Sequence, residues 1–103
     1  MLPAAPVLCE VTRNGKKIAA VAESFHSALV THNFQGPLIT AAAVHVDVSI
    51  PNFVTQEFLA LDESPRPADA IYRTACKRVG GYIPAPECVG HGVTLDEELL
   101  GKA

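Results

Sequence analysis

The chain has 103 residues, a net charge of −3 and 49% apolar residues. This length suits one domain, and we expect residues 1–103 to form it, with 1–6 as a loose N-terminal end. So small a negative charge steers no nucleic acid toward the protein. No apolar run approaches the ~20 residues that cross a bilayer. The three cysteines form no disulfide framework, which favours a reduced, cytoplasmic protein.

The first third of the chain predicts a β-hairpin followed by a short helix. Two strand-like runs, 7–13 and 17–22, flank Asn14-Gly15, a pair that suits a two-residue type I′ turn. The residues that face one another in this register are apolar or nearly so, which places Cys9 in the core. Residues 24–33 then have a helical spacing of apolar positions, carried by Phe25, Ala28, Leu29 and His32.

The middle of the chain predicts a second hairpin. Residues 38–50 form the longest strand candidate, because apolar and more polar residues alternate from position 42 onward. Pro51-Asn52 is typical of a turn. Residues 53–61 predict a further strand that returns antiparallel to the one before it.

The last third predicts two helices separated by an irregular segment. Residues 68–79 have an apolar stripe at helical spacing, and 82–93 show no clear period. Residues 94–97 form a capping box that opens a short last helix. The predicted fold class is therefore α+β, with a small antiparallel sheet built from two β-hairpins in the order β-β-α-β-β-α-α and helices packed on one face.

His45 and Asp47 are the first candidates for chemistry, because residues two apart on a strand point to the same side. A carboxylate beside a histidine orients the ring for proton transfer. With a two-residue turn, Phe58 lies opposite His45. With a three-residue turn, Glu57 lies opposite Asp47, where two close carboxylates would raise one pKa. A solvated polar face is the alternative, and period-two alternation alone predicts it.

Cys88 and His91 are the second candidates, with a Cys-x-x-His spacing in the irregular segment. A structural zinc site needs four ligands, and the chain has no second pair of this kind. We therefore expect no metal and no cofactor. His91 stands between two glycines, where a side chain can approach a ligand closely.

Two functions of different classes follow. The first is a small homo-oligomeric interaction or small-ligand-binding module, with a dimer favoured, because a short chain this rich in apolar residues exposes some of them. The second is a small enzyme with a general acid–base site for a small polar substrate. Its catalytic residues would be His45, Asp47 and His91, and its ligand-binding residues Tyr82, Phe58 and Glu57. The first is favoured, because the chain carries no recognisable catalytic motif.

Overall fold

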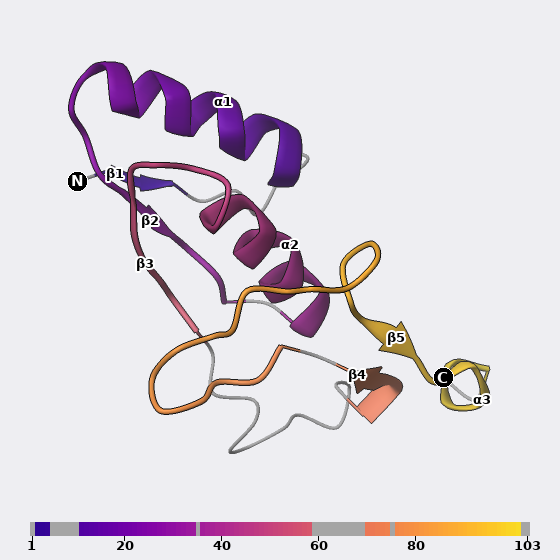
Figure 1. The fold of residues 1–103 in the computed structure, drawn as a ribbon. Coiled ribbons are helices and arrows are strands. Elements are labelled where there is room, and N and C mark those ends of the chain that lie inside the picture. Colours follow the sequence, from indigo (N-terminus) through magenta and orange to yellow (C-terminus); the bar gives the residue numbers. More distant parts are fainter. Residues whose placement is uncertain (1, 5–10, 35, 59–69, 75, 102–103) are drawn as a thin grey trace.

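The computed structural model describes residues 2–4, 11–34, 36–58, 70–74 and 76–101. They form a mixture of helices and strands. A three-stranded parallel sheet carries two helices, and a smaller antiparallel pair of strands lies toward the C-terminal end (Figure 1).

Helix α1 (Val11–Ser24) occupies most of the segment predicted as the first hairpin, so that prediction is wrong. Asn14-Gly15 lies inside the helix and makes no turn. Gly15, Ala19 and Ala22 follow the i, i+4, i+7 spacing of one helix face and are buried, whereas most other described side chains of α1 are exposed. The strand-like alternation is thus overridden by a helical stripe of small residues. Residues 7–10, and with them the predicted core position of Cys9, lie outside the described residues.

Helix α2 (Pro37–Asp47) replaces the longest predicted strand, which is also wrong. Pro37 stands in its first turn, where the missing N–H costs nothing. Eight of its eleven residues are buried, among them the run from Ala41 to Val44. A helix buried almost all round gives an apolar run, and periodicity alone cannot distinguish such a run from a buried strand.

The sheet consists of β1 (Leu2–Ala4), β2 (Leu29–Thr31) and β3 (Phe53–Gln56), paired in parallel in that order. Parallel neighbours need a crossover connection, and α1 and α2 supply the two crossovers. The predicted antiparallel sheet of two hairpins is therefore wrong. Residues 2–4, expected to belong to a loose end, form β1. The predicted helix over 24–33 is wrong, because this segment holds only the last residue of α1 and then strand β2.

The strand predicted from residue 53 is confirmed as far as Gln56, but its partner is β2 and not the segment before it.

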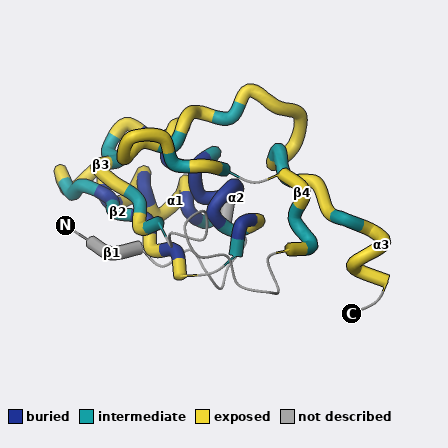
Figure 2. The backbone as a smooth tube through the Cα atoms, turned by 90° about the horizontal axis from the view of Figure 1, so that it is seen from below, coloured by how far each residue is buried: buried dark blue, intermediate teal, exposed yellow. Residues whose placement is uncertain are grey.

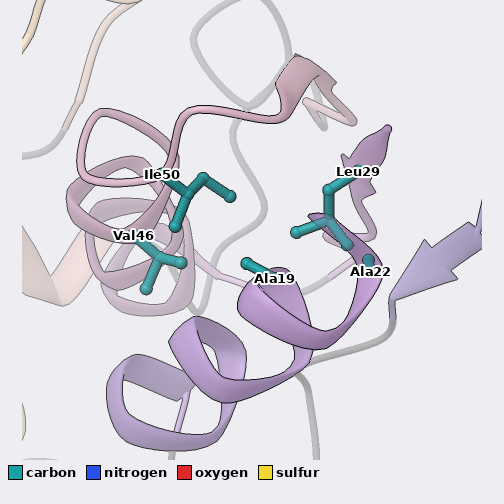
Figure 3. Close-up of a cluster of buried hydrophobic side chains, with 5 residues drawn as sticks. All are labelled: Ala19, Ala22, Leu29, Val46 and Ile50. Atoms are coloured by element: carbon teal, nitrogen blue, oxygen red, sulfur yellow. The ribbon is translucent and has the colours of Figure 1, made fainter. Parts of the chain in front are cut away.

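A small apolar cluster joins the two helices to the sheet. Figure 3 shows its five buried side chains gathered between α1, β2 and the end of α2: Ala19, Ala22, Leu29, Val46 and Ile50. The alanines let the helices approach closely. A Cβ atom on Gly15 would lie only 3.4 Å from a γ-carbon of Val46.

The C-terminal part is mostly exposed (Figure 2). Strand β4 (Tyr72–Thr74) pairs antiparallel with β5 (Thr94–Leu95), and helix α3 (Glu97–Leu100) follows. The predicted helix over 68–79 is wrong where the structure describes it. The irregular segment 82–93 and the short last helix are confirmed, although Asp96, and not residue 94, accepts the capping hydrogen bonds.

No helix in the described ranges is long and apolar enough to cross a membrane. The cytoplasmic address, the homo-oligomer and the absence of nucleic-acid partners stay predictions.

One buried polar contact ties α2 to the sheet. The Thr31 hydroxyl of β2 donates a hydrogen bond to Asp47 Oδ1 at the end of α2, and both residues are buried. Asp47 Oδ2 has no hydrogen-bond partner among the described atoms. Burial raises the pKa of Asp47 from 3.8 to about 6, although the bond from Thr31 acts in the opposite direction.

We expect this carboxyl group to make stability fall as the pH rises. Below the unfolded-state pKa of 3.8, Asp47 is protonated in the folded and the unfolded state, and it does not lower the free energy of unfolding. Above the folded-state value of about 6 it is ionised in both states, and the folded state then carries the full penalty. The wild type should lose roughly 3 kcal/mol of unfolding free energy across this window that Asp47→Asn does not lose. Urea unfolding at a series of pH values measures the difference, and parallel pH profiles would contradict it.

The close contact of α1 with α2 gives a second prediction. Gly15→Ala removes the entropic cost of glycine inside a helix, and its new Cβ meets Val46 at an ordinary contact distance, so the free energy of unfolding should rise by about 0.5–1 kcal/mol. Gly15→Leu needs space that the interface lacks and should lower it by about 1–3 kcal/mol. Thermal unfolding compares both with Lys17→Ala, an exposed control on the same helix. A stabilised leucine variant would show that the helices do not pack this way.

Candidate functional site

The parallel pairing of β2 and β3 brings two ionisable residues to one edge of the sheet. Thr31 and Gln56 are register partners, and each is the last residue of its strand. The next residues are His32 and Glu57. The Glu57 N–H donates to the Thr31 carbonyl at 2.9 Å, which continues the ladder by one step. Because the carboxyl ends of parallel strands meet at one edge, His32 and Glu57 are neighbours there.

His32 and Glu57 contact each other directly. His32 Nδ1 lies 2.5 Å from Glu57 Oε2, and the two side chains are 46% and 44% exposed. The same carboxylate oxygen accepts a hydrogen bond from the Asn33 N–H at 2.9 Å. The pair is therefore held in place and still open to a substrate.

Asn33 links this pair to helix α2. Its side chain is fully buried, and its Nδ2 donates to Thr40 Oγ1 at 2.7 Å. Thr40 lies in the first turns of α2 and is buried as well. Since the backbone of Asn33 holds Glu57 and its side chain holds α2, this residue fixes the strand end relative to the helix.

The arrangement suits proton transfer. When His32 Nδ1–H donates to the carboxylate, the lone pair of the neutral ring is on Nε2. Glu57 then fixes the tautomer and orientation of the ring and would stabilise the imidazolium that forms when Nε2 takes a proton. A histidine placed in this way can take a proton from a bound molecule and return it.

The structure separates two of the residues predicted to be catalytic. Because α2 is helical, His45 and Asp47 do not share a face, and the reason for pairing them is gone. His45 instead lies beside His91, with ring centroids 6.0 Å apart and an edge-to-face arrangement. Asp47 bonds to Thr31 instead. The catalytic role of all three stays a prediction.

The predicted ligand-binding residues are divided between two places. Phe58 and Tyr82 line a cavity of about 300 Å³ together with Asp47, while Glu57 contacts His32 at the strand edge. Cys88, of the Cys-x-x-His pair, is an exposed free thiol. Within the described segments, no three His, Cys, Asp or Glu side chains are placed to hold a metal ion.

His32 is the residue that sequence reasoning missed, since it was assigned to the apolar stripe of a helix. A signal was present. The runs before His32 and Glu57, 29–31 and 53–56, are both short and rich in β-branched or aromatic residues. Had the segment between them been interpreted as a helix, the two runs would have formed a β-α-β unit with both polar residues at its carboxyl edge.

Most of the chain matches a known family. Residues 6–99 match the family model described as "Enolase C-terminal domain-like". A D-mannonate dehydratase of Caulobacter vibrioides is 36% identical over 91 residues, which cover 86% of this chain and 22% of the relative. A D-gluconate/D-galactonate dehydratase of Picrophilus torridus is 34% identical over 87 residues, which cover 84% of this chain and 22% of the relative.

A solved structure agrees with these matches. A mandelate racemase/muconate lactonizing enzyme from a Jannaschia species superposes with a TM-score of 0.75 at 32% identity, over 88% of this chain and 22% of that one. The chain thus spans about a fifth of the length of the relatives it matches.

These matches correct the function favoured by the sequence. The preference for a homo-oligomeric interaction or ligand-binding module is wrong, because the relatives are enzymes and not binding modules. The absence of a recognisable motif was misleading, since the two polar residues at the strand ends lie 25 positions apart and belong to no short pattern. The chain belongs to the enolase C-terminal domain-like family.

Proposed function

We propose that this chain provides the His32–Glu57 acid–base pair of a sugar-acid dehydratase. The observation that carries the proposal is the 2.5 Å contact of His32 Nδ1 with Glu57 Oε2 at the carboxyl edge of two parallel strands. The named activities of the similar enzymes, dehydration of mannonate and of gluconate or galactonate, supply the substrate class.

Dehydration of a sugar acid removes a proton from the carbon next to the carboxylate and a hydroxyl group from the following carbon. In the proposed step, His32 Nε2 takes the proton, and the electrons of the broken C–H bond form the new C=C bond as the C–O bond breaks. Glu57 stabilises the imidazolium, which gives its proton to the departing hydroxyl so that water leaves. The enol product then tautomerises to a 2-keto-3-deoxy acid.

Enzymes of the enolase superfamily combine a lysine or histidine base with one or two Mg²⁺ ions that stabilise the intermediate. In the part of the chain that the structure describes, no group of three candidate ligands is placed to hold such an ion. The described residues therefore do not fit the metal, and no step proposed here passes through it. The expectation of no cofactor stays a prediction.

The alternative function, a small enzyme with a general acid–base site, is thus retained as a class. The residues proposed to carry it are now His32 and Glu57. Asp47 is only 4% exposed and already bonded to Thr31, which leaves it poorly placed to meet a substrate at the strand edge. Glu57, expected to bind ligand, is instead proposed to orient the base.

The test measures dehydration of D-mannonate, D-gluconate and D-galactonate by the protein, and it monitors the reaction through the appearance of the keto acid. His32→Asn should lower kcat by about 10²–10⁴-fold, because it removes the group that moves the proton. Glu57→Gln keeps the size of the side chain and loses its charge, so its effect should be smaller and in the same direction.

The matched control is His26→Asn. His26 is exposed, and its backbone has a φ of 52°, a conformation that asparagine tolerates well. This variant should keep the wild-type rate. If His32→Asn is as active as His26→Asn on every substrate that the wild type converts, or if the wild type converts none of the three acids, the proposed function is wrong.

A further inference from the structure

The chain reverses direction tightly between Cys76 and Cys88. Val79 and Tyr82 form an antiparallel bridge, in which the Val79 N–H donates to the Tyr82 carbonyl at 2.7 Å and the Tyr82 N–H donates back at 3.0 Å. The two residues between them, Gly80-Gly81, have φ angles of 57° and 90°, and a two-residue type I′ turn requires such positive values. This turn sends the segments before and after it back toward each other.

The pairing of β4 with β5 holds the outer ends of these segments together. Thr74 of β4 is the register partner of Thr94 of β5. The Thr74 hydroxyl also donates to the carbonyl of Gly92, two residues before Thr94, at 3.1 Å. Carried two residues beyond Thr74, the antiparallel register places Cys76 opposite Gly92, and residues in such positions lie about 4.5–5.5 Å apart at Cα.

The Cys88 side chain packs against the same glycine. A Cβ atom on Gly92 would overlap Cys88 Sγ, so the sulfur occupies the space that a side chain at position 92 would fill. The register brings Cys76 to Gly92 from β4, and this contact brings Cys88 to it from the segment after the turn. The two cysteines are therefore neighbours in space, although twelve positions separate them in the sequence.

The electrostatics of the two thiols agree with this placement. Burial raises the pKa of the Cys76 thiol, and the negative charge of a Cys88 thiolate raises it further. A charge has this effect only on a group close to it. The thiols differ in access, because Cys88 is exposed and Cys76 is partly buried. A dissolved oxidant would therefore react first with Cys88.

Little burial stabilises the segment that the cysteines enclose. None of residues 76–92 is buried, and the side chains of Val79 and Tyr82 are 64% and 80% exposed. A segment with so little buried surface opens locally at a low cost in free energy. A covalent bond across it would restrict the open state and so favour the closed turn.

We propose that Cys76 and Cys88 form a reversible disulfide, with a low-molecular-weight disulfide such as glutathione disulfide as the oxidant. The Cys88 thiolate attacks one sulfur of glutathione disulfide, which forms a mixed disulfide and releases one glutathione thiolate. Cys76 then loses its proton, its thiolate attacks Cys88 Sγ, and the second glutathione leaves as a thiolate. The two glutathione thiolates take up the protons that the cysteines lost. Two electrons have passed from the cysteines to the oxidant.

The experiment equilibrates the protein in buffers of known glutathione and glutathione disulfide concentration, and peptide-mapping mass spectrometry identifies the bond formed. Because the fold already holds both thiols at Gly92, the equilibrium constant for the Cys76–Cys88 bond should be at least about tenfold larger in the folded protein than in the same protein in urea.

Hydrogen exchange gives a second measurement on the folded protein. The amide protons of Val79 and Tyr82, which bond across the turn, should exchange at least about tenfold more slowly after oxidation. The Val48 amide, which bonds to the Val44 carbonyl at the end of α2, is the internal control and should exchange at the same rate in both forms.

Single-thiol variants test the order of the two steps. In a Cys9→Ser background, Cys76→Ser should stop at the mixed disulfide of Cys88 with glutathione. In the same background, Cys88→Ser should react at least about tenfold more slowly, because Cys76 is less accessible and its raised pKa leaves less thiolate. Cys9→Ser alone is the matched control and should form the Cys76–Cys88 bond like the wild type.

Three results would overturn the proposal. The first is an equilibrium constant no larger in the folded protein than in urea. The second is a bond that joins either cysteine to Cys9 or to a second copy of the chain. The third is unchanged amide exchange at Val79 and Tyr82 after oxidation. His32→Asn separates this test from that of the proposed function, because it should abolish dehydration and still form the disulfide.

Discussion

The parallel pairing of β2 with β3 is the constraint on which the site depends. An antiparallel pair would carry the residues after the two strands to opposite ends of the sheet. The parallel pair carries both to one edge, so His32 and Glu57 meet with 2.5 Å between their polar atoms. Backbone hydrogen bonds set this distance, since the ladder continues to the Glu57 N–H. Little additional side-chain entropy is therefore lost when His32 and Glu57 form this contact.

Such a pairing requires a buried crossover, and α2 provides it. Strands in a parallel sheet are covered by helices, and a covering helix that also contacts its neighbour must be apolar on most of its surface. Ala41, Ala42 and Ala43 meet this demand without bulk, while Thr40 and Asp47 give the helix one polar tie near each end. The same helix thus supports the segment after β2 through Asn33 and the central strand β2 itself through Thr31.

Some elements of this fold could be predicted from the sequence and others could not, and the difference has a physical cause. The strand at Phe53 and the last helix have local signals, β-branched residues in one and a capping pattern in the other. Helix α2 has no periodic signal, because a segment buried on most sides loses the period that distinguishes helix from strand. Asn14-Gly15 was a true turn signal in isolation, and the tertiary contact of Gly15 with α2 overrides it.

The candidate site was missed for the same reason. His32 and Glu57 become neighbours only after β2 and β3 are known to be parallel, and that follows from α2 being a helix. One error over residues 38–50 therefore moved the acid–base pair from the strand ends to His45 and Asp47. Both interpretations sought a carboxylate beside a histidine, and the structure has such a contact between His32 and Glu57. Residue types alone thus indicate which side chains to look for, whereas their location depends on the topology of the sheet.

Because side chains alternate along a strand, the two faces of this sheet carry different polar residues. Thr31 and Gln56 face α2, and His32 and Glu57, one residue further along, face away from it. The open face can hold the half-exposed His32–Glu57 pair, because solvent satisfies its remaining polar atoms. The covered face cannot do so without a partner for each buried polar atom. The atoms of Asp47 and Gln56 that have no hydrogen-bond partner in the described part of the chain are therefore the less expected feature of the two.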